Sequence, residues 1–115
     1  MMATAAQAKR PVRVVIADDH PIMRDGLRQL LQDQLDIELL GEAESGYEAL
    51  RMVRKSRADV LVLDTDMPGC SAIEVMRQLN GSETNVILFS SGTPKELVFE
   101  ALSRFARSGG QERAA

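Results

Sequence analysis

The sequence predicts an α/β domain in which helices cover both faces of a parallel sheet. From Pro11 onward, short apolar segments alternate with segments of helical period. The short segments are rich in Val, Ile and Leu and show no polar alternation, as strands do when both faces of their sheet are covered. Four such strand–helix units follow one another through short loops, an order that is typical of α/β proteins.

Four segments are expected to form the strands of this sheet. They read VRVVIA at 12–17, IELLG at 37–41, DVLVLD at 59–64 and NVILFS at 85–90. Each is followed by a helical segment, and right-handed crossovers place every loop that follows a strand at the same edge of the sheet. In open α/β sheets that edge is where ligands bind, so it is where we expect the functional site.

The segments between the strands carry apolar residues at helical spacing, which is expected to pack each helix on the sheet. Three of these stripes are Met23, Leu27, Leu30 and Leu31; Ala72, Val75, Met76 and Leu79; and Val98, Ala101, Leu102 and Phe105. Pro21 is expected in the first turn of the first helix, where its missing N–H costs nothing and a preceding polar side chain can cap the helix. Pro94 is expected to repeat that arrangement.

Composition and charge argue against several classes of protein, namely nucleic-acid-binding, membrane-spanning and secreted proteins. The chain has 115 residues, and we expect one domain at 11–107 between flexible tails at 1–10 and 108–115. A formal net charge of −3 disfavours direct binding to nucleic acid. No apolar run approaches the roughly 20 residues of a membrane span, and the N-terminal segment has no apolar stretch of signal-peptide length. A single cysteine, Cys70, fits a reducing cytoplasm.

Polar side chains follow three of the expected strands at the point where each strand ends. Asp18 and Asp19 follow the first strand, Asp64 ends the third, and Ser90 ends the fourth. Carboxylates crowded at one edge repel one another unless a cation compensates them, and hard oxygen ligands suit Mg²⁺. The pattern therefore favours a magnesium site that could also bind phosphate oxygens. The alternative from the residues alone is that the aspartates cap helices or form turns and that Ser90 bonds local backbone.

Three motifs in order resemble the receiver domains of two-component response regulators. They are DDHP at 18–21, LDTDMPG at 63–69 and the serine pair at 90–91 after VILF. The segments DGLRQLL, GEAESGYEAL and KELVFEAL resemble the branch usually joined to a LuxR-type helix-turn-helix. The likeness covers roughly residues 12–107, and it implies a flavodoxin-like doubly wound parallel sheet with strand order 2-1-3-4-5 when complete.

The resemblance implies a role for each of the polar residues. Asp64 would be the phosphoacceptor, which attacks a phosphohistidine of a sensor histidine kinase. Asp19 would bind Mg²⁺ directly, and Asp18 directly or through water. Asp64 and the backbone carbonyl of Asp66 would complete the protein ligands of the metal, and Ser90 would sense the phosphoryl group through its hydroxyl.

Some features of the family have no counterpart in this sequence. Receivers of this type continue after the fourth helix with an apolar fifth strand that ends in a lysine, followed by a fifth helix. From Ser103 this chain reads SRFARSGGQERAA, which contains neither that lysine nor the aromatic switch residue of the fifth strand. We therefore expect an incomplete sheet, lower stability, and self-association as a homodimer or by exchange of elements.

Two functions stay open at this point. The first is a signalling switch, not an enzyme, that accepts and slowly loses a phosphoryl group on Asp64 with Mg²⁺. The second is a degenerate receiver that acts as a phosphorylation-independent interaction or dimerisation module. The three aspartates favour the first function, and the missing fifth unit favours the second. His20 beside the acidic pair is interpreted as a polar cap or solvent contact in preference to a metal ligand or phosphoryl carrier.

Overall fold

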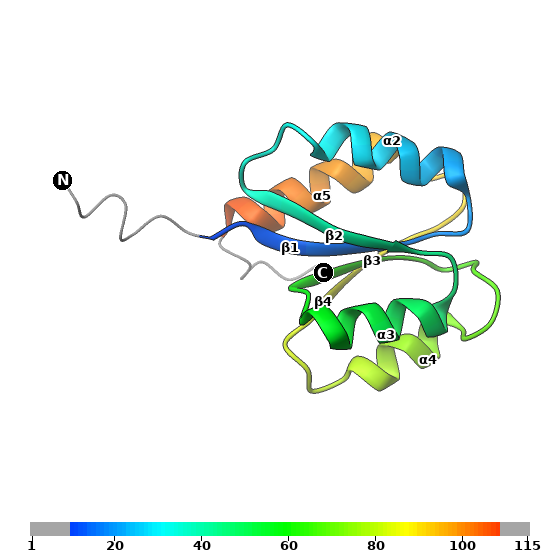
Figure 1. Cartoon of the computed structure of the whole chain (residues 1–115). Coiled ribbons are helices and arrows are strands. Elements are labelled where there is room, and N and C mark those ends of the chain that lie inside the picture. The colour runs from blue at the N-terminus through cyan, green and yellow to red at the C-terminus, as the bar shows by residue number, and fades with distance from the viewer. Residues whose placement is uncertain (1–9, 109–115) are drawn as a thin grey trace.

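The computed structural model describes residues 10–108 and places a four-stranded parallel sheet at their centre (Figure 1). The strand order is β2-β1-β3-β4, and every pairing is parallel. The elements in chain order are β1 (Val12–Ala17), α2 (Pro21–Leu31), β2 (Ile37–Ala43), α3 (Gly46–Ser56), β3 (Val60–Asp64), α4 (Ala72–Leu79), β4 (Asn85–Phe89) and α5 (Lys95–Arg107). The predicted α/β class is confirmed, and so are the first four positions of the predicted strand order.

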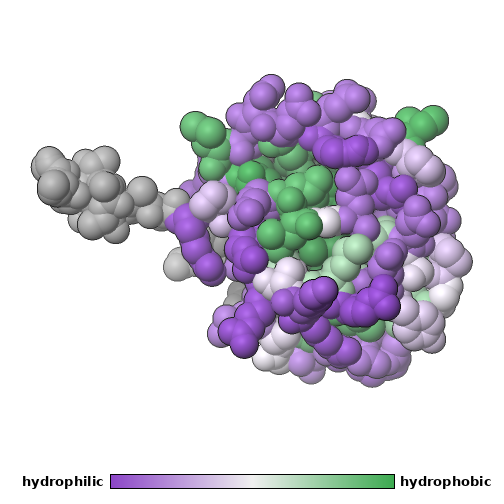
Figure 2. All heavy atoms as spheres, in the orientation of Figure 1, coloured by the Kyte–Doolittle hydropathy of each residue, from purple (hydrophilic) through white to green (hydrophobic). Residues whose placement is uncertain are grey.

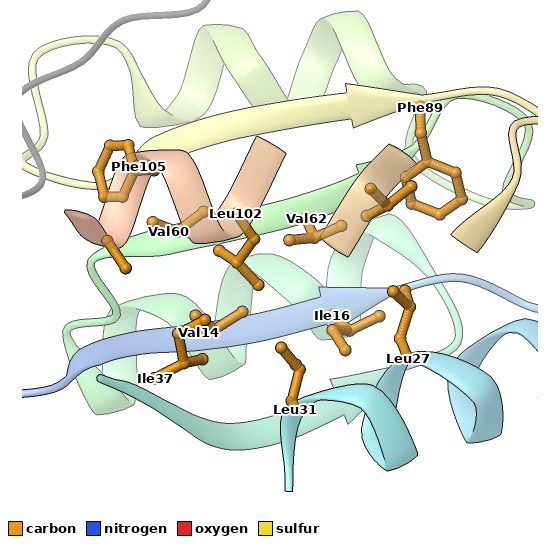
Figure 3. Packing of buried hydrophobic residues seen from close by; sticks show 12 residues of the cluster. Val14, Ile16, Leu27, Leu31, Ile37, Val60, Val62, Phe89, Leu102 and Phe105 are labelled. Atoms are coloured by element: carbon orange, nitrogen blue, oxygen red, sulfur yellow. The ribbon is translucent and has the colours of Figure 1, made fainter. Parts of the chain in front are cut away.

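Helices α2 and α5 pack on one face of the sheet, and their apolar stripes fill that half of the core (Figure 3). Leu27 and Leu31 of α2 meet the inward side chains of β1, while Leu102 of α5 lies over β3. These leucines are at most 3% exposed. At roughly 2 kcal/mol for each fully buried Leu or Val side chain, this layer is a main source of stability.

Helices α3 and α4 cover the opposite face with a second apolar cluster (Figure 1). Each is preceded by an N-cap serine whose hydroxyl accepts a backbone N–H of the first turn: Ser45 from Glu48 and Ser71 from Glu74. Such caps satisfy donors that have no partner inside the helix. Because both faces are covered, all five residues of β3 are buried, and this explains why the strand lacks polar alternation.

Three local expectations need correction. Met76 was expected to face the sheet but is 38% exposed, because Val75 and Leu79 already fill the contact of α4 with the sheet. Pro21 begins α2 as predicted, yet the N-cap residue His20 makes no side-chain cap hydrogen bond. Pro94 is the N-cap of α5 and not its first residue, so its carbonyl, and not a polar side chain, accepts the N–H of Leu97.

The predicted tails lie almost wholly outside the described residues, which include only Arg10 and Ser108 of them. Ser108 is the C-cap of α5.

In the orientation of Figure 1, the surface shows apolar side chains gathered near β2 and surrounded by largely hydrophilic side chains (Figure 2). Within residues 10–108, no helix combines the length and apolarity that a membrane span requires.

The loop after β3 is seated on the first turn of α3 through a very close approach. A side-chain carbon at Gly46 would overlap the carbonyl oxygen and the side chain of Cys70. Cys70 is itself buried and has a free thiol. Glycine at position 46 therefore allows the loop that begins at Asp64 to lie against α3, and this contact helps to fix the edge of the sheet that carries the site.

Candidate functional site

Two buried carboxylates stand at the carboxyl ends of adjacent strands. Asp18 directly follows β1 and Asp64 is the last residue of β3, and the preceding residues Ala17 and Leu63 are register partners. Asp18 is 1% exposed and Asp64 is 2% exposed. The parallel topology thus brings together two residues that are far apart in the sequence, at the edge where the sequence placed the site.

Asp19 and His20 complete a group of four potential metal ligands with the two buried aspartates. One ligand atom from each of these residues lies within 4.8 Å of those of the other three. Asp19 and His20 are exposed, whereas Asp18 and Asp64 are buried. The group is therefore anchored in the sheet on one side and open to solvent on the other.

The two oxygens of Asp64 have different surroundings. Oδ1 accepts the backbone N–H of Asp66 at 3.0 Å, which is a turn of the kind that a local structural role would give. Oδ2 is buried and has no hydrogen-bond partner among the described residues. A buried carboxylate oxygen without a partner carries a large desolvation penalty. A bound cation or an incoming electrophile could pair with this atom and offset that penalty.

Asp18 is held by several contacts that leave it facing the same site. Its Oδ1 accepts the backbone N–H of His20 at 3.0 Å and lies 2.9 Å from the ring Nδ1 of His20. Its backbone carbonyl accepts Nη1 of Arg24 at 2.6 Å. Arg24 also lies 3.3 Å from Glu42 and 3.2 Å from Glu44, so it ties the end of β1 to the end of β2.

The electrostatics of the site follow from this burial. Desolvation raises the pKa of Asp64 to about 6; the N–H of Asp66 opposes the rise, and the carboxylates of Asp18 and Asp66 add to it. The hydrogen bond to Asp18 and the charges of Asp18 and Asp19 raise the pKa of His20. The site thus has an excess of negative charge that favours binding of a cation.

A hollow of about 150 Å³ opens beside Asp64 and is the space available to a substrate group. Ser90 stands on its rim, one residue beyond β4, and its backbone N–H donates to Oγ1 of Thr93 at 3.2 Å. The two hydroxyl oxygens lie 3.4 Å apart. The complete lining is Asp18, His20, Met23, Asp64, Phe89, Ser90, Ser91, Gly92 and Thr93.

Asp66 contributes to this edge mainly through its backbone and a loop contact. Its N–H holds Asp64, and its Oδ2 accepts the N–H of Ser91 at 3.4 Å. The Asp66 side chain therefore bridges the loops after β3 and β4. The carboxylate of Asp66 is not in the group of four ligands described above.

The contacts made by His20, Arg24 and Thr93 were not predicted from the sequence. The ring of His20 lies within 3.7 Å of oxygens from Asp18, Asp19 and Asp64. The available signal for Arg24 was an arginine in the first turn of the helix that follows the acidic pair, because a side chain there points back towards the strand end. Thr93 gave no signal beyond lying three residues after Ser90.

Comparison with protein families gives a match to the response regulator receiver domain over residues 14–108. The transcriptional regulatory protein YhcZ of Bacillus subtilis is 36% identical over 99 residues, which are 84% of this chain and 46% of YhcZ. The nitrate/nitrite response regulator NarL of Escherichia coli is 31% identical over 85% of this chain and 46% of its own length. The chain thus spans less than half of each of these two relatives.

Solved structures show the same likeness. The receiver domain of the response regulator NarL from Mycobacterium tuberculosis superposes with a TM-score of 0.68 at 33% identity, over 83% of this chain and 78% of that one. The response regulator domain of Thermotoga maritima CheB has a TM-score of 0.77 at 23% identity, over 91% of this chain and all of that one, and supports the fold alone. With its family match, its relatives and its four-stranded parallel sheet, the chain belongs to the receiver domains of two-component response regulators.

Proposed function

We propose that this domain is a signalling switch that accepts a phosphoryl group on Asp64 from a sensor histidine kinase in the cytoplasm, with Mg²⁺ bound beside the acceptor. The observation that carries the proposal is the Oδ2 atom of Asp64, which is buried, lacks a partner and belongs to a group of metal-ligating residues. Family membership supports the same reading. Such a switch does not turn over a free substrate, so the domain would act as a signalling module and not as an enzyme.

The chemical step is a transfer between a nitrogen and an oxygen. An oxygen of ionised Asp64 attacks the phosphorus of a phosphohistidine, so an O–P bond forms while the N–P bond breaks and its electron pair stays on the leaving imidazole. With a pKa of about 6, Asp64 is mostly ionised near neutral pH and can act as the nucleophile. The hollow beside it offers room for the group that is transferred.

The carboxylates of Asp18, Asp19 and Asp64, with the backbone carbonyl of Asp66, are the ligands that we propose for Mg²⁺. All of them are hard oxygen donors, as Mg²⁺ prefers. Bound Mg²⁺ would neutralise the negative charge that gathers between the carboxylates and the phosphoryl oxygens. Arg24 would position Asp18 by holding its carbonyl, and the N–H of Asp66 would fix Oδ1 of Asp64.

Ser90 is the residue that we propose to sense the phosphoryl group. Its hydroxyl lies on the rim of the hollow, and among residues 10–108 it has only a long contact of 3.4 Å to Thr93, so it can turn to donate to a phosphoryl oxygen. Ser90 begins the loop that leads into α5. A shift of Ser90 on phosphorylation would therefore bias the position of that loop and helix, which is how a local charge becomes a signal.

The proposal is tested by incubating the protein with Mg²⁺ and a small-molecule phosphodonor and measuring its intact mass. We expect one phosphoryl adduct per chain that requires Mg²⁺ and disappears in Asp64→Ala. Asp33→Ala is the matched control, because Asp33 is an exposed carboxylate after α2 and lies outside the ligand group; it should still form the adduct. Absence of an adduct at every donor concentration, in protein shown to be folded, would contradict the proposal.

A second candidate function is a phosphorylation-independent module that binds a second copy of the chain through β4. Within residues 10–108, β4 pairs with β3 alone, and Leu88 of β4 is 45% exposed. An open strand edge with an apolar side chain is a surface for strand pairing. Sedimentation velocity tests this function: a concentration-dependent dimer that Leu88→Lys abolishes supports it, whereas a monomer at all concentrations excludes it.

A further inference from the structure

His20 is the sole histidine of the chain, and it faces the acidic site from the solvent side. Its ring Nδ1 lies 2.9 Å from Oδ1 of Asp18, 3.2 Å from Oδ1 of Asp19 and 3.7 Å from Oδ2 of Asp64. The phosphoryl transfer proposed for Asp64 does not use this ring. The ring nitrogen of His20 could therefore be a ligand for a cation that the carboxylates bind.

The three distances match the spacing of ligands around one small metal ion. Ligand atoms about 2.1 Å from a metal stand about 3.0–3.4 Å apart in octahedral or tetrahedral arrangements. The distances from Nδ1 to Asp18 and Asp19 fall within or next to that interval, and the distance to Asp64 exceeds it by roughly 0.3 Å. A small ring rotation of an exposed side chain can supply this difference.

An independent observation points to a ligand at the same place. Oδ2 of Asp64 is buried and has no hydrogen-bond partner among the described residues, and its nearest basic group is the ring of His20. At 3.7 Å the ring does not hydrogen-bond to that oxygen. A cation between the two would give Oδ2 of Asp64 the partner that it lacks.

We infer that His20 is a metal ligand and that it makes this site selective for Zn²⁺ and other late first-row divalent ions over Mg²⁺. The inference rests on the proposed cation site and adds to it a second class of ion. Imidazole nitrogen suits zinc, nickel and copper, whereas magnesium prefers oxygen and retains its waters. One nitrogen and three carboxylate oxygens are a complete set of ligands for tetrahedral zinc.

The ring nitrogen of His20 that carries the proton would differ between the zinc-bound and the metal-free protein. In the absence of metal, a carboxylate can only accept, so Nδ1 carries the proton that bonds to Asp18. As a ligand, Nδ1 has to release that proton and Nε2 has to carry one instead. Zn²⁺ bound in this way would occupy the carboxylates that phosphorylation needs, so it would compete with Mg²⁺.

The tautomer change gives a direct test in the unmodified chain, prepared without a histidine tag. Because there is one histidine, its ring ¹⁵N resonances require no assignment. We expect Zn²⁺ to move the Nδ1 resonance to the position of a metal-bound, unprotonated nitrogen, and Mg²⁺ to leave Nδ1 unbound. A ring that keeps its Nδ1 proton under saturating Zn²⁺ would overturn the inference.

Calorimetry of variants gives the second test. His20→Asn should weaken Zn²⁺ binding by about 10–100-fold or more and change Mg²⁺ binding by less than about threefold. Cys70→Ala is the control for zinc capture by the thiol, which is buried in the loop after β3, and should leave Zn²⁺ affinity unchanged. Zinc affinity that survives in His20→Asn, or that depends on Cys70, would overturn the inference.

These outcomes separate this inference from the proposed function. If Mg²⁺ binds and supports the phosphoryl adduct while His20→Asn leaves Zn²⁺ affinity unaltered, the switch stands and the inference about His20 fails. If wild-type protein binds Zn²⁺ through His20 but neither binds Mg²⁺ nor forms an adduct, the proposed function fails and the zinc site stands.

Discussion

Asp18 and Asp64 lie side by side at the ends of adjacent strands, and each is at least 98% buried. Within residues 10–108, the ring of His20 is the basic group at salt-bridge distance from both of them. Two buried carboxylates with so little positive charge nearby destabilise the fold when no metal is bound. The metal-free protein is therefore expected to be less stable at this point, as a site of the kind proposed for Mg²⁺ would be.

Replacing Asp64 with Asn should therefore stabilise the metal-free protein. The folded-state pKa of about 6 exceeds the ordinary value of 3.8, so ionisation of Asp64 is harder in the folded protein than in the unfolded chain. Removing that charge should raise the free energy of unfolding by about 1–3 kcal/mol near neutral pH. Urea denaturation in the presence of EDTA measures this difference.

The sign of the pH dependence follows from the same pKa. The stability that protonated Asp64 contributes to the folded protein is fully present below about pH 4 and is lost as the pH rises through about 6. The gain from Asp64→Asn should thus shrink when the pH is lowered from about 7 to about 5. Asp33→Asn, at an exposed carboxylate after α2, is the control and should give no such gain. Equal effects of both variants would contradict this explanation.

Gly46→Ala should destabilise the protein even though alanine is the better helix former. A methyl group at position 46 meets the carbonyl of Cys70, which is backbone and can move only with its loop. We expect a loss of about 1–3 kcal/mol, measured by urea denaturation. Gly41→Ala meets only the flexible end of Met52 and should cost less. A stabilised Gly46→Ala would show that the loop after β3 does not depend on this contact.

The two leucines of α5 offer a matched test of the core. Leu102 is 1% exposed and packs on the sheet, whereas Leu97 is 56% exposed. Leu102→Ala should lower the free energy of unfolding by about 2–5 kcal/mol, and Leu97→Ala by less than about 0.5 kcal/mol. Similar losses at both positions, in thermal or urea denaturation, would mean that α5 does not pack as described.

Ser90→Ala should lower the yield of phosphorylated protein. A hydroxyl that donates to a charged phosphoryl oxygen contributes about 1–2 kcal/mol, so the amount of adduct at a fixed donor concentration should fall by about 5–30-fold. Ser90→Thr retains a hydroxyl and should retain most of the yield. Intact mass of the wild-type protein and of both variants measures the yield. An undiminished adduct in Ser90→Ala would show that the Ser90 hydroxyl does not contact the phosphoryl group.

Much of the fold could be predicted because buried strands have a recognisably apolar sequence. β3 reads VLVLD, and all five of its residues are buried, so its composition alone indicated a covered strand. The convergence of Asp18 and Asp64 followed from parallel topology, since strand ends share an edge. The same reasoning could not foresee the exposure of Met76, because a helical stripe does not reveal how wide the contact of a short helix is.

Side-chain partners in the site were harder to foresee than positions on strands. His20 was expected to be a cap or a solvent contact, and it makes no cap bond, because its ring turns back to Asp18. Arg24 joins two strand ends through contacts with residues that are far from it in the sequence. Such contacts depend on the three-dimensional path of three separate segments, which no local pattern records.

Binding of Mg²⁺ tests the central claim most directly, because every step of the proposed function needs the strand-end carboxylates to share one ion. Isothermal titration of the metal-free protein should show one Mg²⁺ per chain, and both Asp18→Asn and Asp64→Asn should abolish or strongly weaken this binding. Each variant should first be shown to be folded. Mg²⁺ affinity that is the same in wild-type protein and in both variants would contradict the account.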